Sequence, residues 1–184
     1  MKVVVGLGNP GSRYDGTRHN VGFDVINMLA SGQGGAGFQT RFQGQIAELW
    51  IQSEKVLLVK PDTFMNLSGR CVREVFDFYN LSPEDILVIC DDINLPLGKL
   101  RVRAEGTHGG HNGLRDIQKH LGTTQYSRLK IGVGSPGEDV VDHVLGRFRP
   151  VERPVIEDAL GKSAQAVLVW VFQGVGACMN QYNG

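Results

Sequence analysis

The chain has 184 residues, which suits one domain with a buried core, and its hydrophobic content of 41% is typical of a soluble globular protein. Its 19 basic residues balance its 19 acidic ones, so the net charge by itself neither favours nor excludes a nucleic-acid or membrane partner. No stretch approaches the roughly 20 apolar residues of a membrane span, and the three widely spaced cysteines form no disulfide framework. We therefore expect one domain over residues 1–184, without a secretory leader, in the reducing cytoplasm.

The first predicted elements follow from short apolar runs. The β-branched residues Val3–Val5, stopped by a glycine, predict a buried strand over residues 2–7. Asn20 then predicts an N-cap for a helix, because apolar side chains recur behind it at helical spacing. The glycine-rich segment 31–37 predicts a flexible connection to the next strands.

Strand and helix patterns alternate through the rest of the chain. The predicted elements are strands over 44–51 and 55–60, a helix over 68–80, strands over 86–90 and 99–103, a short helix over 114–121, a strand over 128–133 and a long helix from about 151. A last short helix over 175–182 is left open. The alternation predicts an α/β fold, a single domain whose mixed, largely parallel twisted sheet is flanked by helices. Sites in such sheets form where strands end, and the loops there carry most of the unusual polar residues.

The loop after the first strand raises a nucleotide-binding alternative. Residues 6–11 match GxGxxG, the pattern of a dinucleotide-binding loop. In that fold the loop opens directly into a helix that receives the pyrophosphate, whereas Pro10 is followed here by several polar residues. We therefore expect the glycines to form a tight turn that places Asn9 at the strand end, and we expect no cofactor.

A histidine and an aspartate are the strongest catalytic candidates. His19 stands where a polar loop meets a helix, and Asp91 directly follows an apolar strand. A carboxylate that accepts a hydrogen bond from an imidazole fixes its tautomer and stabilises its charged form, although each residue alone could equally be structural. The chain has no GxSxG elbow, and we interpret Ser68 as a helix cap and Cys90 as a buried, inert thiol. The pair would therefore act on water.

Two further groups of polar residues stand in these loops. His108 and His111, with Asp91 and Asp92, could be drawn as metal ligands, but their spacing matches no standard site and we expect no metal. Asparagine amides can orient a water and stabilise an oxyanion without adding charge, although loop asparagines are commonly turn residues. The candidates are Asn9, Asn66 and Asn112.

The basic residues are unevenly distributed. Between residues 99 and 130, seven basic residues stand against only Glu105 and Asp116. Over 99–103 they alternate with apolar residues, which is typical of a half-exposed strand with a basic outer face. The stretch indicates either an anionic partner or an ordinary solvated surface. The seven are Lys99, Arg101, Arg103, Arg115, Lys119, Arg128 and Lys130.

Five motifs, taken in order, resemble the bacterial peptidyl-tRNA hydrolases. They are Gly-Leu-Gly-Asn-Pro-Gly (6–11), Thr-Arg-His-Asn-Val-Gly (17–22), Pro-Asp-Thr-Phe-Met-Asn-Leu-Ser-Gly (61–69), Asp-Asp-Ile-Asn-Leu-Pro (91–96) and Gly-His-Asn-Gly-Leu (110–114). The resemblance runs from about residue 2 to residue 180. It implies a monomeric enzyme, free of metal and cofactor, that hydrolyses the ester between a peptide and the 3′-terminal ribose of peptidyl-tRNA.

The resemblance also implies a role for each matching residue. His19 would activate water, and Asp91 would orient His19. Asparagine side chains would position the peptide or the water (Asn9 and Asn66) and polarise the ester carbonyl (Asn112). The positions that contact the peptide or the acceptor end of the tRNA are matched by Tyr14, Phe64, Met65 and His111. Those that hold the 5′-phosphate are matched by Arg103 and Lys130.

Two departures from the family and one rival function remain. Asn94 stands where many relatives have a second aspartate, and residues 181–184 carry no basic extension. Organellar relatives recruited into RNA splicing supply the alternative of a non-catalytic RNA-binding scaffold. Such a protein should have an enlarged apolar docking patch and a transit peptide, whereas this sequence opens directly on its first strand. We therefore expect the hydrolase.

Overall fold

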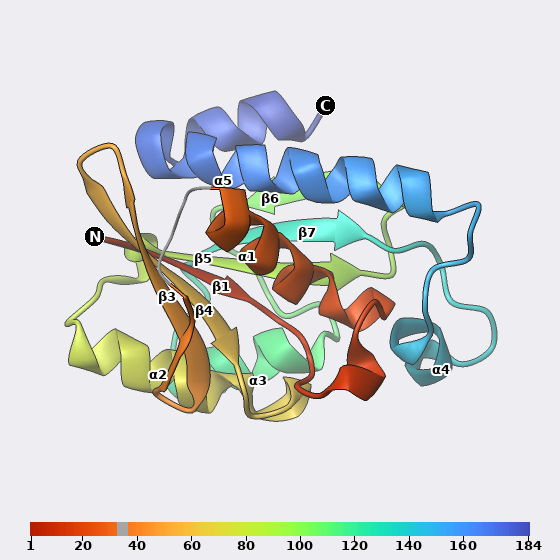
Figure 1. Cartoon of the computed structure of the whole chain (residues 1–184), viewed down its shortest axis with the longest axis horizontal. Coiled ribbons are helices and arrows are strands. Elements are labelled where there is room, and N and C mark those ends of the chain that lie inside the picture. Colours follow the sequence, from red (N-terminus) through yellow and green to blue (C-terminus); the bar gives the residue numbers. More distant parts are fainter. Residues whose placement is uncertain (33–36) are drawn as a thin grey trace.

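The computed structural model describes residues 1–32 and 37–184, so the predicted connection over 31–37 falls in large part outside the described residues. In the described part of the chain, seven strands form one twisted sheet in the order β2-β3-β4-β1-β5-β7-β6 (Figure 1). The strands are β1 (Lys2–Gly6), β2 (Gln39–Arg41), β3 (Gly44–Ile51), β4 (Glu54–Pro61), β5 (Ile86–Asp92), β6 (Leu100–Arg103) and β7 (Ser127–Gly132). The α-helices are α1 (Val21–Gly32), α2 (Ser68–Phe78), α3 (Asn112–Leu121), α4 (Val140–Leu145) and α5 (Arg153–Tyr182).

The direction of the strands decides where a site can form. The four central strands β4, β1, β5 and β7 are parallel to one another. The outer pairs β2–β3, β3–β4 and β6–β7 are antiparallel. The predicted α/β fold with a mixed, largely parallel sheet is therefore confirmed. The carboxyl ends of the central strands meet at one edge of the sheet, which is where ligands bind in such folds.

Helices cover both faces of the sheet, with α1 and α5 on one face and α2 and α3 on the other (Figure 1). Successive side chains of a strand point to opposite faces. Val4 therefore packs in the core under α1 and α5, whereas Val3 and Val5 pack in the core under α2 and α3. Burying one such side chain contributes about 1.5–3 kcal/mol, so the two cores make a rigid platform for the loops.

Two predicted helix caps are wrong. Asn20 ends a 3₁₀ helix, and its side chain accepts a hydrogen bond from the Asn9 N–H at 2.8 Å and donates to the Asn9 carbonyl at 3.0 Å. Ser68 is the first residue of α2, and its hydroxyl donates to the Met65 carbonyl at 2.8 Å. Both helices follow 3₁₀ turns, which satisfy backbone groups at helix ends and release the side chains for other partners.

The assignment of Arg128 to a basic surface is also wrong. Arg128 is 1% exposed, because its side chain packs against the loop that contains Gly106 and Thr107. There its guanidinium donates to the carbonyls of Gly106, Thr107 and Thr124. Arg128 thus satisfies the backbone of the loop that leads into α3, rather than offering its charge to a partner.

The C-terminal region forms one long helix with a kink. The last helix, left open by the sequence, is present, since α5 continues to Tyr182 beyond a kink at Gly174, whose φ of 83° favours glycine. Beyond the kink the chain turns back along the first part of α5 (Figure 1).

The sequence did not predict α4 or the short edge strand β2. Among the described residues, no helix combines the length and the apolarity needed to cross a membrane.

Candidate active site

A cavity of about 550 Å³ opens at the carboxyl ends of β1, β5 and β7. Loops from the strand ends, the start of α3 and the side of α4 together form its wall. Eight of the predicted site residues line it: Asn9, His19, Met65, Asn66, Asp91, His111, Asn112 and Lys130. Three predicted contact residues lie outside the lining: Tyr14, Phe64 and Arg103.

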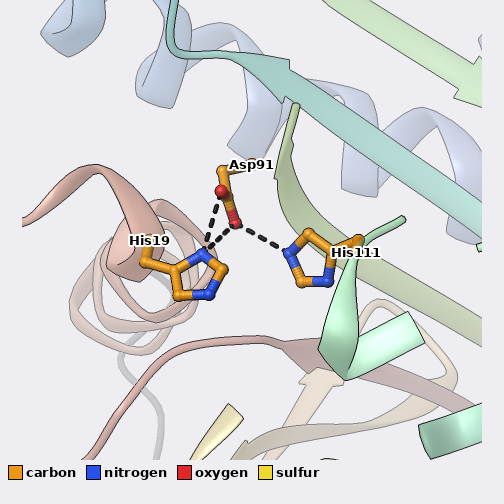
Figure 2. A group of neighbouring side chains, drawn as sticks. All are labelled: His19, Asp91 and His111. Carbon is orange, nitrogen blue, oxygen red and sulfur yellow. Dashed lines mark hydrogen bonds and ion pairs between the residues drawn. The ribbon is translucent and has the colours of Figure 1, made fainter. Parts of the chain in front are cut away.

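The centre of the cavity wall is a carboxylate held between two imidazole rings (Figure 2). Asp91 lies at the end of β5 and is 4% exposed. Its two oxygens each lie 2.9 Å from Nδ1 of His19, and its Oδ1 lies 2.8 Å from Nε2 of His111. Figure 2 shows that the three side chains come from three separate segments of the chain.

The two histidines keep this carboxylate ionised. Burial by itself raises the pKa of Asp91, but electrostatic attraction to the ring N–H groups of His111 and His19, and the hydrogen bonds that these groups donate, outweigh it and hold that pKa well below its usual range. A carboxylate that is charged and fixed in this way can orient an imidazole and stabilise its protonated form.

Three consecutive residues of the 3₁₀ helix over Arg18–Asn20 bind three different parts of the protein. Arg18 is buried, and its guanidinium donates to the Arg147 carbonyl and pairs with Glu152 at 2.9 Å. His19 bonds to Asp91, and Asn20 bonds to the backbone of Asn9. The backbone around His19 is therefore fixed from both sides, which keeps its ring against Asp91.

The three asparagines line the same cavity but differ in which of their amide atoms already have a hydrogen-bond partner. Oδ1 of Asn9 accepts a hydrogen bond from the Met65 N–H at 2.8 Å, so its NH2 group is the part left for a ligand. Oδ1 of Asn112 accepts from Arg115, which likewise leaves the NH2 group. Asn66 is exposed at the cavity wall. The cavity thus offers amide N–H donors near the His–Asp pair.

The aromatic contact candidates form a pair beside a strained turn. The rings of Tyr14 and Phe64 meet edge to face with centroids 6.3 Å apart. Phe64 has a φ of 62°, a conformation that a side chain of this kind rarely adopts and that costs about 1–3 kcal/mol. The hydrogen bond from Met65 N–H to Asn9 holds the next residue in place.

The pairing of β6 with β7 places the basic residues that the sequence suggested for phosphate binding. Lys130 lines the cavity, and its Nζ lies 3.7 Å from Asp92. Arg101 is its cross-strand partner, and Arg103 stands two residues further along β6, on the same face of the sheet. The half-exposed basic strand that the sequence predicted is therefore present next to the cavity.

The chemistry of the His–Asp–His group argues against a metal site. The ligand atoms of His19, Asp91 and His111 lie within 4.8 Å of one another, whereas the predicted alternative centred on His108 is not the cluster that forms. A histidine that binds a metal through Nε2 donates its Nδ1–H to an acceptor. Nδ1 of His111 instead accepts from the backbone N–H groups of Gly113 and Leu114, so its surroundings suit an Nε2–H donor.

A covalent nucleophile also finds no support among the described residues of the cavity wall. Their side chains include no serine. Cys90 is in the wall, but burial, together with the charge of Asp91, raises the pKa of its thiol well above its usual range. A thiol that stays protonated is a poor nucleophile, as the sequence predicted for this residue.

One wall of the cavity was not predicted from the sequence. Four apolar side chains of α4 line it: Val140, Val141, Val144 and Leu145. Their spacing places two pairs on one face of a helix, and Asp139 caps that helix by accepting from the N–H of Asp142. This pattern, bounded by an Asp cap and a following glycine, was the available indication of an amphipathic helix.

These features define an α/β enzyme equipped for general-base catalysis: an ionised carboxylate fixes an imidazole at a cavity that also offers amide donors. Comparison with known proteins identifies the family. The family model described as "Peptidyl-tRNA hydrolase" matches residues 3–184, and the chain belongs to the peptidyl-tRNA hydrolase family.

Individual relatives match over nearly their whole length. A peptidyl-tRNA hydrolase of Rhodopirellula baltica is 52% identical, with 100% of this chain and 97% of the relative aligned. One of Halalkalibacterium halodurans is 48% identical, with 100% of both chains aligned. A crystal structure of peptidyl-tRNA hydrolase from Acinetobacter baumannii, 38% identical, superposes with a TM-score of 0.94 over 100% of this chain and 95% of that one.

Proposed function

We propose that this protein hydrolyses the ester between the peptide and the 3′-terminal ribose of peptidyl-tRNA, using His19 as the general base that activates water. The observation that carries the proposal is the pair between His19 Nδ1 and the Asp91 carboxylate at 2.9 Å. Because Nδ1–H donates to Asp91, the lone pair of Nε2 is left to accept a proton from water. Family membership supplies the substrate class.

The proposed reaction has two steps. Nε2 of His19 removes a proton while the water oxygen adds to the ester carbonyl carbon, and Asp91 stabilises the imidazolium that forms. The resulting oxyanion then collapses, the bond to the ribose 3′-oxygen breaks, and His19 returns the proton to that oxygen. The products are tRNA with an intact 3′-hydroxyl and a peptide carboxylic acid, which then loses its proton to solvent.

The asparagines would act on the ester and the water. The NH2 groups of Asn9 and Asn112 are suited to donate to a carbonyl oxygen that gains charge, and Asn112 is the proposed donor to the oxyanion. The exposed amide of Asn66 would hold the peptide backbone or the attacking water. Neutral donors stabilise the oxyanion without placing a cation beside the base, which must stay unprotonated.

The substrate would be held at its acceptor end. Met65 and the apolar face of α4 would contact the peptide, since these residues make the apolar part of the wall. Tyr14 and Phe64 would contact the terminal nucleotide, whose base can stack on aromatic rings. Arg103 and Lys130 would bind the 5′-phosphate of the tRNA. We propose that a monomer suffices, because one chain supplies the whole set.

The test is release of labelled peptide from an N-blocked aminoacyl-tRNA in the presence of EDTA, for the wild type and for His19→Ala. Release by the wild type alone is the expected result. Release that EDTA abolishes would point to metal catalysis, and equal release by both proteins would reject His19 as the base. If neither protein releases peptide although both bind tRNA, the chain is an RNA-binding scaffold instead.

A further inference from the structure

The carboxylate of Asp91 serves two imidazole rings, although one is enough to orient a general base. Its Oδ1 accepts from His19 Nδ1 at 2.9 Å and from His111 Nε2 at 2.8 Å. The two rings lie 5.2 Å apart between centroids and are tilted by 45° to each other. In Figure 2 they approach the carboxylate from opposite sides.

The start of α3 fixes the tautomer of His111. His111 is the N-cap of this helix, and its Nδ1 accepts from the backbone N–H groups of Gly113 at 3.2 Å and Leu114 at 3.4 Å. A backbone N–H can only donate, so Nδ1 carries no proton and the proton of the ring is on Nε2, facing Asp91. The N-terminus of a helix also disfavours positive charge, which opposes a second proton on this ring.

His19 has the opposite tautomer, with its proton on Nδ1. Its Nδ1 faces both oxygens of Asp91, and the other ring nitrogen faces away from them (Figure 2). The two histidines therefore present the same group, an N–H, to one carboxylate, but only His19 has a ring nitrogen that is free to take up a proton.

We propose that His111 is a positioning residue that acts through Asp91. As an Nε2–H donor whose Nδ1 already accepts from the backbone, it fixes the rotamer of the carboxylate and takes part of the charge of Oδ1, and the ring left to accept a proton from water is that of His19. This inference rests on the proposed function of His19. It departs from the sequence interpretation, which assigned His111 to the substrate contacts and weighed it as a metal ligand.

Because His111 and His19 share the Asp91 carboxylate, His111 also affects how strongly Asp91 stabilises the protonated form of His19. Because Oδ1 already accepts from His111, it attracts a proton on His19 less strongly than an unshared carboxylate does. Removal of the His111 donor should strengthen the hold of Asp91 on the imidazolium of His19. The base would then stay protonated up to a higher pH and would return its proton to the leaving oxygen less readily.

Within residues 1–32 and 37–184, few other ionisable groups line the cavity around this trio. Asp92 follows Asp91 on β5 but pairs with Lys130 of β7, and His108 lines the cavity from the loop before α3. The buried thiol of Cys90 precedes Asp91. The neighbouring helix α4 faces the cavity with apolar side chains. A change in the titration of His19 on substitution of His111 therefore reports on their shared carboxylate.

The decisive variant is His111→Asn. Asparagine is a good N-cap, so α3 keeps its cap, but its side chain is too short to replace the bond to Asp91. His108→Asn is the matched control, because His108 lines the same cavity and its Nδ1 also accepts from a backbone N–H, that of Gly110. Unlike His111, it makes no contact with Asp91 among the described hydrogen bonds.

Two measurements separate this inference from the proposed function. Nitrogen-detected NMR of the ring tautomers needs no substrate, and at neutral pH we expect Nε2–H for His111 and Nδ1–H for His19. In peptide release, His111→Asn should lower kcat about 10- to 100-fold, the loss of one hydrogen bond to a charged group, with little change in KM. The acid limb of its kcat/KM profile should move to higher pH, and the NMR titration of His19 should move in the same direction.

The possible results distinguish the positioning role of His111 from the proposed hydrolase activity. An Nδ1–H form of His111, or a His111→Asn variant in which His19 titrates as it does in His108→Asn, would overturn the positioning role. An inactive wild type with the expected tautomers would instead reject the hydrolase proposal and leave the arrangement of the trio intact.

Discussion

Replacing Asp91 with asparagine keeps the size of the side chain but places an NH2 group where an oxygen now accepts a hydrogen bond. If the amide oxygen takes the Oδ1 position, the NH2 group meets Nδ1 of His19, which lies 2.9 Å from both carboxylate oxygens. That contact favours the tautomer with the proton on Nε2, which cannot accept a proton from water. If the amide is rotated by half a turn, its NH2 group takes the Oδ1 position. Nδ1 of His19 and Nε2 of His111 then both face a hydrogen-bond donor instead of an acceptor.

The magnitude follows from the bonds that are lost. Asp91 accepts hydrogen bonds from two rings, and a hydrogen bond to a charged group is worth about 1.5–3 kcal/mol. Loss of about 4–5 kcal/mol from the transition state corresponds to a fall in kcat of roughly 10³- to 10⁴-fold. A fall of about 10⁴ also follows when the acid of a Ser-His-Asp triad is replaced by its amide.

Single-turnover release of labelled peptide measures this effect, with thermal unfolding as a check on folding. The matched control is Asp92→Asn, the next residue of β5, which pairs with Lys130 and does not contact His19 among the described residues. Asp91→Asn should lose activity far more than the control does. A folded Asp91→Asn variant whose rate is within tenfold of the wild type would show that Asp91 does not support His19 in this way.

Three further substitutions test other parts of the account. Glu152→Ala leaves the buried Arg18 guanidinium without its partner and should destabilise the protein by about 2–3 kcal/mol, seen as a lower Tm, whereas Glu157→Ala on the exposed face of α5 should not. Arg103→Ala should weaken binding of full-length peptidyl-tRNA and flatten the slope of log K against log salt by about 1, while leaving a short aminoacyl-nucleotide ester unaffected; equal effects on both substrates would reject a phosphate contact. Burial and the charge of Asp15, opposed by Lys60, raise the pKa of Asp24 to about 6, above its value in the unfolded chain. The folded state then holds more protons between about pH 4 and 6, so stability should fall as pH rises through this window, and urea unfolding of Asp24→Asn should lack that slope.

The fold was predictable where the sequence pattern reflects burial. The continuous apolar runs of β1 and β5 predict central strands because both faces of these strands are covered. The alternation over 99–103 predicts β6 because only one face of this strand is covered. The short helix α4 was missed because six residues give little periodicity and the apolar face of this helix lines the cavity rather than a core.

The candidate site was predictable in its composition but not in its hydrogen bonds. Residues such as Asn9, His19 and Asp91 stand in loops at strand ends, and parallel strands bring those ends together. Asn20 binds the backbone of Asn9, and Arg128 binds the carbonyls of Gly106 and Thr107; these partners lie 11 to 22 residues away, and no local pattern contains them. The same is true of the contact between His111 and Asp91, because the cap position on α3 and the end of β5 meet only in the folded chain.

The most direct test of the central claim is the pH dependence of peptide release under single-turnover conditions, for wild type and His19→Ala, across about pH 5 to 9, the range that contains the titration of histidine. A neutral imidazole is required to accept the proton of water. We therefore expect a wild-type rate that falls as the pH drops, and a rate for His19→Ala that is lower by at least about 10³-fold and lacks this acid limb. A His19→Ala protein that keeps both the wild-type rate and the acid limb would contradict the account.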